Sequence, residues 1–335
     1  MRLVGQKAQS AARGIAERAG ARTARRGARG TARRGRRTLL AGAALLATAV
    51  ASGCASESGG GGGGGGDEGA PAAHGQQPRL APPAQALREY ARDLRASHAA
   101  RAAAAKRWGL AKVPLTPPAP PAVKPPLTTR EGFEVQGQAE LPPVFTTVPT
   151  KDRVVFLTVD DGAEKDPAFL RMMTELKIPY TAFLSDYLVK EDYGYFKRMQ
   201  GRGVVLNNHT LNHRFLPGLS YEAQRREICG MQDVIERRYG KRPELFRPPY
   251  GNYNRDTLRA AKSCGVRAVP LWAAEAFADH MEWREWDRDL HPGDIVLTHF
   301  RGRGDWKGTM PDMIRTFLKT ATDRGYAVAR LEDYL

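Results

Sequence analysis

RVVFLTVDDG, residues 153–162, is the stretch that best predicts the fold of this 335-residue chain. β-Branched and aromatic residues fill most of positions 153–159, which is typical of a buried strand, and two acids and a glycine end the stretch. Further strand-like runs at 180–184, 204–207, 245–246, 268–271 and 295–297 alternate with helix-like segments at 167–176, 187–200, 220–239, 254–263 and 312–324. This alternation predicts an α/β domain with a parallel sheet that can close into a barrel.

Polar residues with catalytic potential stand at the ends of four of these predicted strands. They are Asp160, Asp161, His209, His213, Arg247 and His299. The carboxyl ends of the strands of an α/β barrel form one face, where active sites are assembled. We therefore expect these residues, which are far apart in the sequence, to converge on one site.

His209 and His213 are four residues apart, and on a helical turn they would point the same way and bind one metal ion. Either Asp160 or Asp161 would add a carboxylate. One carboxylate and two imidazoles are the ligands of an open catalytic zinc site, and the second carboxylate is then free to act as a general base. Each motif alone is weak, because adjacent acids are common in solvated turns and most histidine pairs bind no metal.

Four segments together resemble the polysaccharide deacetylase family, also called carbohydrate esterase family 4. They are residues 157–162 (LTVDDG), 209–213 (HTLNH), 247–251 (RPPYG) and 297–299 (LTH), in that order. The resemblance covers residues 142–335 and implies a distorted (β/α) barrel with parallel strands. It also implies a hydrolase that uses a divalent metal to remove acetyl groups from a polysaccharide. Zinc is the metal expected from this ligand set, and cobalt or nickel would substitute for it.

The resemblance also implies roles for individual residues. The metal ligands would be Asp161, His209 and His213. Asp160 would be the general base, kept ionised and oriented by Arg247, and the backbone N–H of Tyr250 would stabilise the oxyanion. His299 would be the general acid that protonates the leaving amine. Trp272 and Leu297 would line the pocket for the acetyl group.

Residues 271–277 (LWAAEAF) depart from the family, which has two aspartates in the corresponding segment. One of those aspartates hydrogen-bonds the acid histidine, and Glu275 is the residue that would replace it here. If nothing supports His299, its pKa would fall and the acid step would weaken. Trp283, Trp286 and Trp306 would either stack on sugar rings or pack within the domain.

Three readings of function follow from these residues. The first is N-deacetylation of a polysaccharide that contains N-acetylglucosamine or N-acetylmuramic acid, with peptidoglycan favoured. The second is O-deacetylation of an acetylated polymer such as xylan. The third is a catalytically weak or inactive protein that binds cell-wall glycan.

The formal net charge of +16 is concentrated at the N-terminus. Before Thr38, twelve basic residues stand against the single acid Glu17, a net charge of +11, which leaves +5 for the rest of the chain. An apolar run at 38–51 follows and has the length of a signal-peptide core. We therefore expect residues 1–53 to direct export, with Arg36-Arg37 similar to a twin-arginine signal, and we expect no nucleic-acid partner.

Cys54 follows small residues at the end of that run, as in a bacterial lipoprotein, and a diacylated cysteine would anchor the protein to the outer face of the cytoplasmic membrane. Residues 54–81 would form a glycine-rich tether, residues 82–112 a helix that serves as a spacer or docks on the domain, and residues 113–141 a proline-rich linker. The catalytic domain would span residues 142–335 and act as a monomer.

Cys229 and Cys264 are the two remaining cysteines. In an oxidising envelope they would form a disulfide that closes a loop of about 35 residues and contributes roughly 3–4 kcal/mol. The alternative is a pair of buried thiols.

Overall fold

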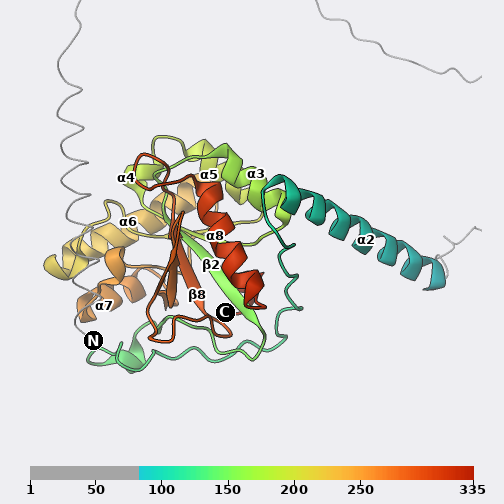
Figure 1. Ribbon diagram of the computed structural model, residues 1–335. Coiled ribbons are helices and arrows are strands. Elements are labelled where there is room, and N and C mark those ends of the chain that lie inside the picture. Colours follow the sequence, from blue (N-terminus) through green and yellow to red (C-terminus); the bar gives the residue numbers. More distant parts are fainter. Residues whose placement is uncertain (1–82) are drawn as a thin grey trace, which may run out of the picture. The chain divides into compact units, whose positions relative to one another are not determined.

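The computed structural model describes residues 83–335, apart from the side chains of residues 83–85. The predicted basic region, signal peptide, Cys54 anchor and glycine-rich tether lie outside the described residues. Residues 89–335 form one compact unit, in which β2 and β8 lie at the centre with helices around them (Figure 1). Within residues 83–335, no helix combines the length and the apolar character needed to cross a membrane.

The central sheet is built around β2, every residue of which is buried. Its order is β4 (Val205–Asn208), β3 (Thr181–Leu184), β2 (Val154–Asp161), β8 (Ile295–His299), β6 (Ala274–Ala276) and β7 (Met281–Trp283), with β9 (Ala327–Ala329) beside the first half of β2. The pairs from β4 to β6 are parallel. Strands this apolar are expected in a parallel sheet that is covered on both faces.

Short pairings carry the sheet from β4 back to β8. Asn208 pairs with Phe246, and Leu245 pairs with Ala268 at the start of β5 (Val269–Pro270). After β5, the N–H of Ala273 donates to the carbonyl of Ile295 in β8 at 2.9 Å. The predicted distorted barrel is therefore confirmed, and irregular segments replace full strands on one side. β1 (Val144–Phe145) lies alongside β5.

Helices connect the strands. They are α3 (Pro167–Leu176), α4 (Asp186–Val189), α5 (Tyr193–Gln200), α6 (Tyr221–Tyr239), α7 (Arg255–Ser263) and α8 (Met310–Asp323), with short 3-10 turns η1 (Gln138–Glu140), η2 (Leu216–Gly218), η3 (Pro249–Gly251) and η4 (Leu331–Asp333). The single helix predicted over 187–200 is wrong, because Asp192 caps a new helix by accepting a hydrogen bond from the N–H of Tyr195. Ser220 caps α6, as the sequence predicted.

The segment that departs from the family, residues 271–277, contains β6, which forms an antiparallel hairpin with β7. The sequence did not predict this hairpin, because its strands are only three residues long and one of them is partly exposed. The hairpin adds β6 to the edge of β8, with Glu275 paired in register with Leu297. It therefore places Glu275 next to the last residues of β8.

Helix α2 (Pro83–Arg107) packs by its C-terminal half on the compact unit. Ala104 and Ala105 are buried in the core, and the guanidinium of Arg101 donates to the carbonyls of Leu176 at 3.0 Å and Pro114 at 2.8 Å. One row of large apolar side chains on this helix is exposed. It consists of Leu87, Tyr90 and Leu94.

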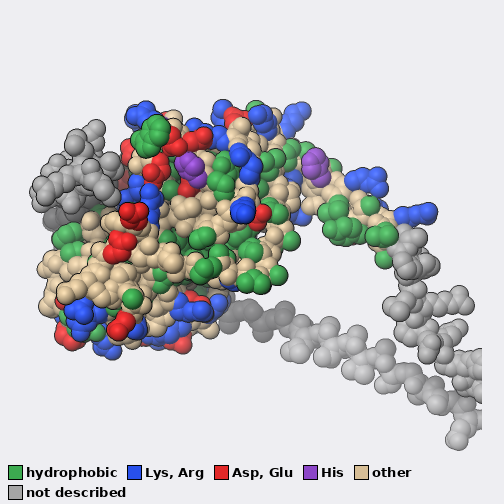
Figure 2. Space-filling model, turned by 90° about the horizontal axis from the view of Figure 1, so that it is seen from below, with side chains coloured by type: hydrophobic (Ala, Val, Ile, Leu, Met, Phe, Trp, Pro, Cys, Tyr) green, Lys and Arg blue, Asp and Glu red, His purple; other side chains and the backbone are tan. Residues whose placement is uncertain are grey.

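Two further features concern the cysteines and the surface. Cys229 in α6 and Cys264 at the end of α7 form a disulfide, so this prediction is confirmed. On the face seen in Figure 2, acidic, basic and hydrophobic side chains are interspersed rather than gathered by type.

Candidate active site

Asp160 and Asp161 are the last two residues of β2, where successive side chains would normally point to opposite faces. Asp161, however, has a positive φ of 83°, which turns the backbone. As a result, Nε2 of His209 lies 3.7 Å from Oδ2 of Asp160 and 3.6 Å from Oδ1 of Asp161. Gly162 makes the turn feasible, because a Cβ there would lie 2.4 Å from a methyl group of Val189.

His209 and His213 meet at Asp161, although not on a helical turn. Nε2 of His213 lies 3.3 Å from Oδ1 of Asp161, and the three potential ligand atoms are all within 4.8 Å of one another. The segment between the histidines is a loop, in which Thr210 and His213 have positive φ values of 73° and 52°. The predicted helical geometry is therefore wrong. Hydrogen bonds from the N–H of Thr210 to Asn208 and from that of His213 to Thr210 hold the loop instead.

The three residues fit a divalent metal ion. Oδ1 of Asp161 is buried and has no hydrogen-bond partner among the described residues, which is costly unless a cation binds it. The Nδ1–H of His209 donates to the carbonyl of Arg247 at 2.7 Å, which leaves the lone pair of Nε2 for a metal. Burial lowers the pKa of both His209 and His213 to about 4, so both are neutral near pH 7.

Asp160 is paired with Arg247, which is fully buried. The guanidinium donates to Asp160 at 2.8 Å and to the hydroxyl of Thr158 at 2.9 Å, and it also donates to the carbonyls of Pro270 and Leu271. Burial raises the pKa of Asp160 to about 6 even though Arg247 acts to lower it. The carboxylate therefore has the pKa of a base that is still ionised near pH 7.

His299 ends β8 and faces the same group of side chains. Its Nδ1 lies 3.2 Å from Oε1 of Glu275 on the neighbouring strand β6. Burial opposes protonation of His299, but Glu275, Asp161 and Asp160 outweigh it and raise its pKa above the ordinary value. Glu275 thus occupies the position in which a carboxylate would support an acid histidine.

Tyr250, Trp272 and Leu297 lie around this centre. Tyr250 has a positive φ of 62°, and its ring packs on that of His213 at 4.7 Å. Trp272 packs so closely on Gly251 that a Cβ there would approach its ring to 2.9 Å. Leu297 is buried in β8, paired with Thr158. The oxyanion role of Tyr250 and the acetyl-pocket roles of Trp272 and Leu297 stay predictions.

Sequence reasoning missed Arg301. Its guanidinium donates to Oδ2 of Asp161 at 2.5 Å. Burial acts to raise the pKa of that carboxyl, but His213, Arg301 and the other two histidines outweigh it and hold the pKa well below its usual range. Arg301 follows His299 by two residues at the end of a predicted strand. This position at a strand end is the feature of the sequence that could have identified Arg301 as a site residue.

The three tryptophans considered for sugar stacking differ in their surroundings. The ring of Trp306 lies 5.7 Å from that of His299, and Trp283 packs beneath the guanidinium of Arg324. Trp286 is 93% exposed.

Known proteins resemble this chain over the region that contains the candidate active site. The family described as polysaccharide deacetylase matches residues 147–269. An uncharacterized protein of Streptomyces coelicolor is 44% identical over 196 residues, which cover 58% of this chain and 78% of that protein. A peptidoglycan-N-acetylglucosamine deacetylase of Bacillus cereus is 28% identical over 169 residues, 46% of this chain and 76% of its own length. A peptidoglycan-N-acetylmuramic acid deacetylase of Bacillus subtilis is 26% identical over 198 residues, 56% of this chain and 73% of its own length.

A solved structure of a peptidoglycan N-acetylglucosamine deacetylase superposes with a TM-score of 0.51 at 22% identity, over 59% of this chain and 94% of that chain. At that identity the likeness concerns the fold alone. Together with the 44% identical relative and the family match, it supports one conclusion. The chain belongs to the polysaccharide deacetylase family.

Proposed function

We propose that this protein is a metal-dependent hydrolase that removes N-acetyl groups from a polysaccharide containing N-acetylglucosamine or N-acetylmuramic acid. The observation that carries the proposal is the position of Asp160. It is buried, paired with Arg247, and within 3.7 Å of His209, one of three side chains suited to a metal. A base next to a Lewis-acid site and opposite an acid histidine is the arrangement that amide hydrolysis needs.

Asp161, His209 and His213 would hold the metal ion. Bound there, a divalent cation would supply Lewis-acid polarisation of the acetyl carbonyl and would lower the pKa of water. The neutral imidazoles and the unpartnered Oδ1 of Asp161 support this role. Zinc suits one carboxylate and two imidazoles, and cobalt or nickel would substitute for it.

Asp160 would take a proton from the attacking water as its oxygen bonds to the acetyl carbon. Arg247 would keep the carboxylate oriented, since four hydrogen bonds fix the guanidinium. The backbone N–H of Tyr250 would donate to the oxyanion that forms on the acetyl oxygen.

His299 would then donate its proton to the amide nitrogen as the carbon–nitrogen bond breaks. An amine anion is too basic to leave unprotonated, so this step needs an acid that is still charged near neutral pH. Glu275 supports that state by lying 3.2 Å from Nδ1 of His299. The products are acetate and a free amino group on the sugar.

Peptidoglycan is the favoured substrate. Similar proteins of Bacillus cereus and Bacillus subtilis are named as peptidoglycan deacetylases, and their matches extend over 73% or more of their lengths. The disulfide Cys229–Cys264 supports work outside the cytoplasm, because disulfides persist in oxidising compartments. We accordingly propose that the protein is exported and anchored through Cys54 at the outer face of the cytoplasmic membrane.

The test is release of acetate from purified peptidoglycan by the metal-loaded protein. Removal of the metal with a chelator should abolish release, and added Zn²⁺ should restore it. Asp160→Asn should lower kcat by about 10³-fold while the protein still binds one metal ion. Full activity of Asp160→Asn would disprove the mechanism. Faster release from acetylated xylan than from peptidoglycan would favour an O-acetyl esterase.

A further inference from the structure

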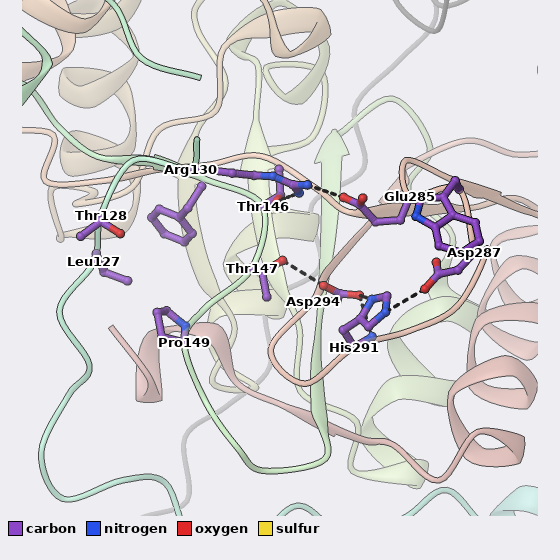
Figure 3. Close-up of a pocket in the computed structure, with 12 residues that line it drawn as sticks. Leu127, Thr128, Arg130, Thr146, Thr147, Pro149, Glu285, Asp287, His291 and Asp294 are labelled. Atoms are coloured by element: carbon purple, nitrogen blue, oxygen red, sulfur yellow. Dashed lines mark hydrogen bonds and ion pairs between the residues drawn. The ribbon is translucent and has the colours of Figure 1, made fainter. Parts of the chain in front are cut away.

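A pocket of about 500 Å³ is lined by Asp294, the residue before β8, and so lies at the opposite end of β8 from His299. Figure 3 shows the residues that line it. Two segments on either side of it, residues 127–149 and residues 285–294, supply its walls. The lining residues are Leu127, Thr128, Arg130, Phe145, Thr146, Thr147, Pro149, Glu285, Trp286, Asp287, His291 and Asp294. None of them belongs to the candidate active site. Because β8 is five residues long, its first and last residues are separated by roughly 13 Å.

Trp286 is the most exposed large hydrophobic side chain named among the described residues, at 93%. It lies in the turn after β7, whereas Trp283 and Trp306 are partly buried against the core. An indole left in water contributes little to folding, yet it offers a large flat surface for stacking. The position of Trp286 at a pocket therefore points to a ligand with a flat apolar face.

The polar wall of the pocket contains more negative than positive groups. Arg130 is ion-paired with Glu285, and His291 lies 3.1 Å from Asp287 and 3.4 Å from Asp294. With His291 protonated, three carboxylates still stand against two cations. Asp294 is buried and accepts hydrogen bonds from Thr147 and the His291 N–H, so Glu285 and Asp287 are the acids that reach solvent.

We propose that this pocket binds a de-N-acetylated sugar, one that carries a free ammonium group, within the glycan that the enzyme acts on. The C–H face of a pyranose ring would stack on Trp286. The ammonium would bind the partly exposed carboxylate of Asp287 beside His291, since Glu285 is held by Arg130. The hydroxyls would hydrogen-bond Arg130 and Thr128. An anionic ligand would meet a net negative wall, and an N-acetylated sugar would lack the charge that the carboxylates complement.

This inference rests on the proposed function, since the free amine is the product of that reaction. The pocket is too far from His299 to contact an acetyl group that is being hydrolysed. It would hold the enzyme on glycan that is already deacetylated while the active site works on a neighbouring acetylated stretch. The consequence is that activity should spread along glycan from regions already processed.

The test measures binding by calorimetry in the full-length, zinc-loaded Asp160→Asn protein, which prevents turnover of the probes. The probes are a glucosamine hexamer and an N-acetylglucosamine hexamer. Trp286→Ala should weaken binding of the glucosamine hexamer about tenfold. Asp287→Asn should weaken the glucosamine hexamer but leave the acetylated hexamer unchanged. Tyr90→Ala, which also removes an exposed aromatic ring but lies outside the pocket, should change neither.

Unchanged binding of the glucosamine hexamer in Trp286→Ala would overturn the proposal. An equal loss for both hexamers in Asp287→Asn would also overturn it, and would indicate a site for neutral saccharides. The proposed function is assayed separately, as acetate release by the wild-type protein. That assay uses an N-acetylglucosamine tetramer, which carries no free ammonium group for the pocket, so failure of one proposal is distinguishable from failure of the other.

Discussion

Histidines lie beside carboxylates at both ends of β8, but the two groups differ in how far water reaches them. At the active-site end, His209 and His213 lie 3.3–3.7 Å from Asp160 and Asp161, and their side chains are 3% and 15% exposed. At the other end, His291 lies 3.1 Å and 3.4 Å from two carboxylates and is 45% exposed.

The pKa shifts of these histidines have opposite signs. Burial lowers the pKa of His209 and His213 to about 4 in spite of the nearby acids. Burial also acts to lower the pKa of His291, but Asp294 and Asp287 together outweigh it and raise the pKa above its ordinary value. At similar distances from carboxylates, the pKa is thus lowered for His209 and His213 and raised for His291, because desolvation outweighs the nearby acids only at the more buried pair. Only the neutral pair is suited to bind a metal ion.

The strongest test of this difference exchanges one histidine at each end for glutamine. His213→Gln should lower zinc affinity by more than about 100-fold, since loss of a ligand should exceed the 10–100-fold cost of losing a residue that only supports one. His291→Gln should leave zinc affinity unchanged. Competition with a chromogenic chelator measures both values. Equal zinc affinity in the two variants would mean that burial does not define the metal site.

The pH profile of kcat should depend on the buried end alone. Asp160 must be ionised to act as a base, and burial raises its pKa to about 6 in the metal-free protein. A bound cation would lower that pKa, so the acidic limb should lie at or below about pH 6 and fall about tenfold per pH unit. His291→Gln should give the same profile. An acidic limb above pH 7 would contradict the assignment of Asp160 as base.

Glu275 provides a test of the acid side. Glu275→Gln removes the charge nearest to Nδ1 of His299, so the pKa of His299 should fall. We expect kcat to fall about tenfold and the basic limb of the profile to move to lower pH. Glu282→Gln is the matched control, because Glu282 pairs with Glu275 across the hairpin but is largely exposed. Equal effects of the two substitutions would contradict a positioning role for Glu275.

The sequence was sufficient to predict the barrel and the residues that meet at its face. Strand-like runs followed by Asp161, His209 and His299 placed these residues at the same ends of parallel strands. The conformations of the connecting loops were not predictable, since left-handed residues such as Thr210 and His213 carry no sequence mark of their φ values. The helical turn expected between the two histidines is the clearest such error.

Contacts between distant parts of the chain could not be derived from the sequence, although Glu275 was named there as the residue that would support His299. Arg301 pairs with Asp161 across 140 residues of sequence, and Glu275 reaches His299 only because a short hairpin extends the sheet. The pocket at the other end of β8 was equally hidden, because its walls come from segments more than 130 residues apart. Exposed Trp286 could be singled out as an aromatic residue, but only the fold shows which surface it lies on.

The smallest predicted effect concerns the exposed end. Asp287→Asn should lower the pKa of His291 by less than about one unit, because an exposed ion pair contributes at most about 1 kcal/mol. The folded pKa of His291 lies above its ordinary value of 6.5, so its contribution to stability is full below that pH and is lost as the pH rises through the folded pKa. Imidazole chemical shifts followed by NMR across pH 5–9 measure the change. A fall of two units or more in the pKa of His291 would mean that carboxylates affect their histidine as strongly at the exposed end of β8 as at the buried end. It would contradict the proposed difference between the two ends.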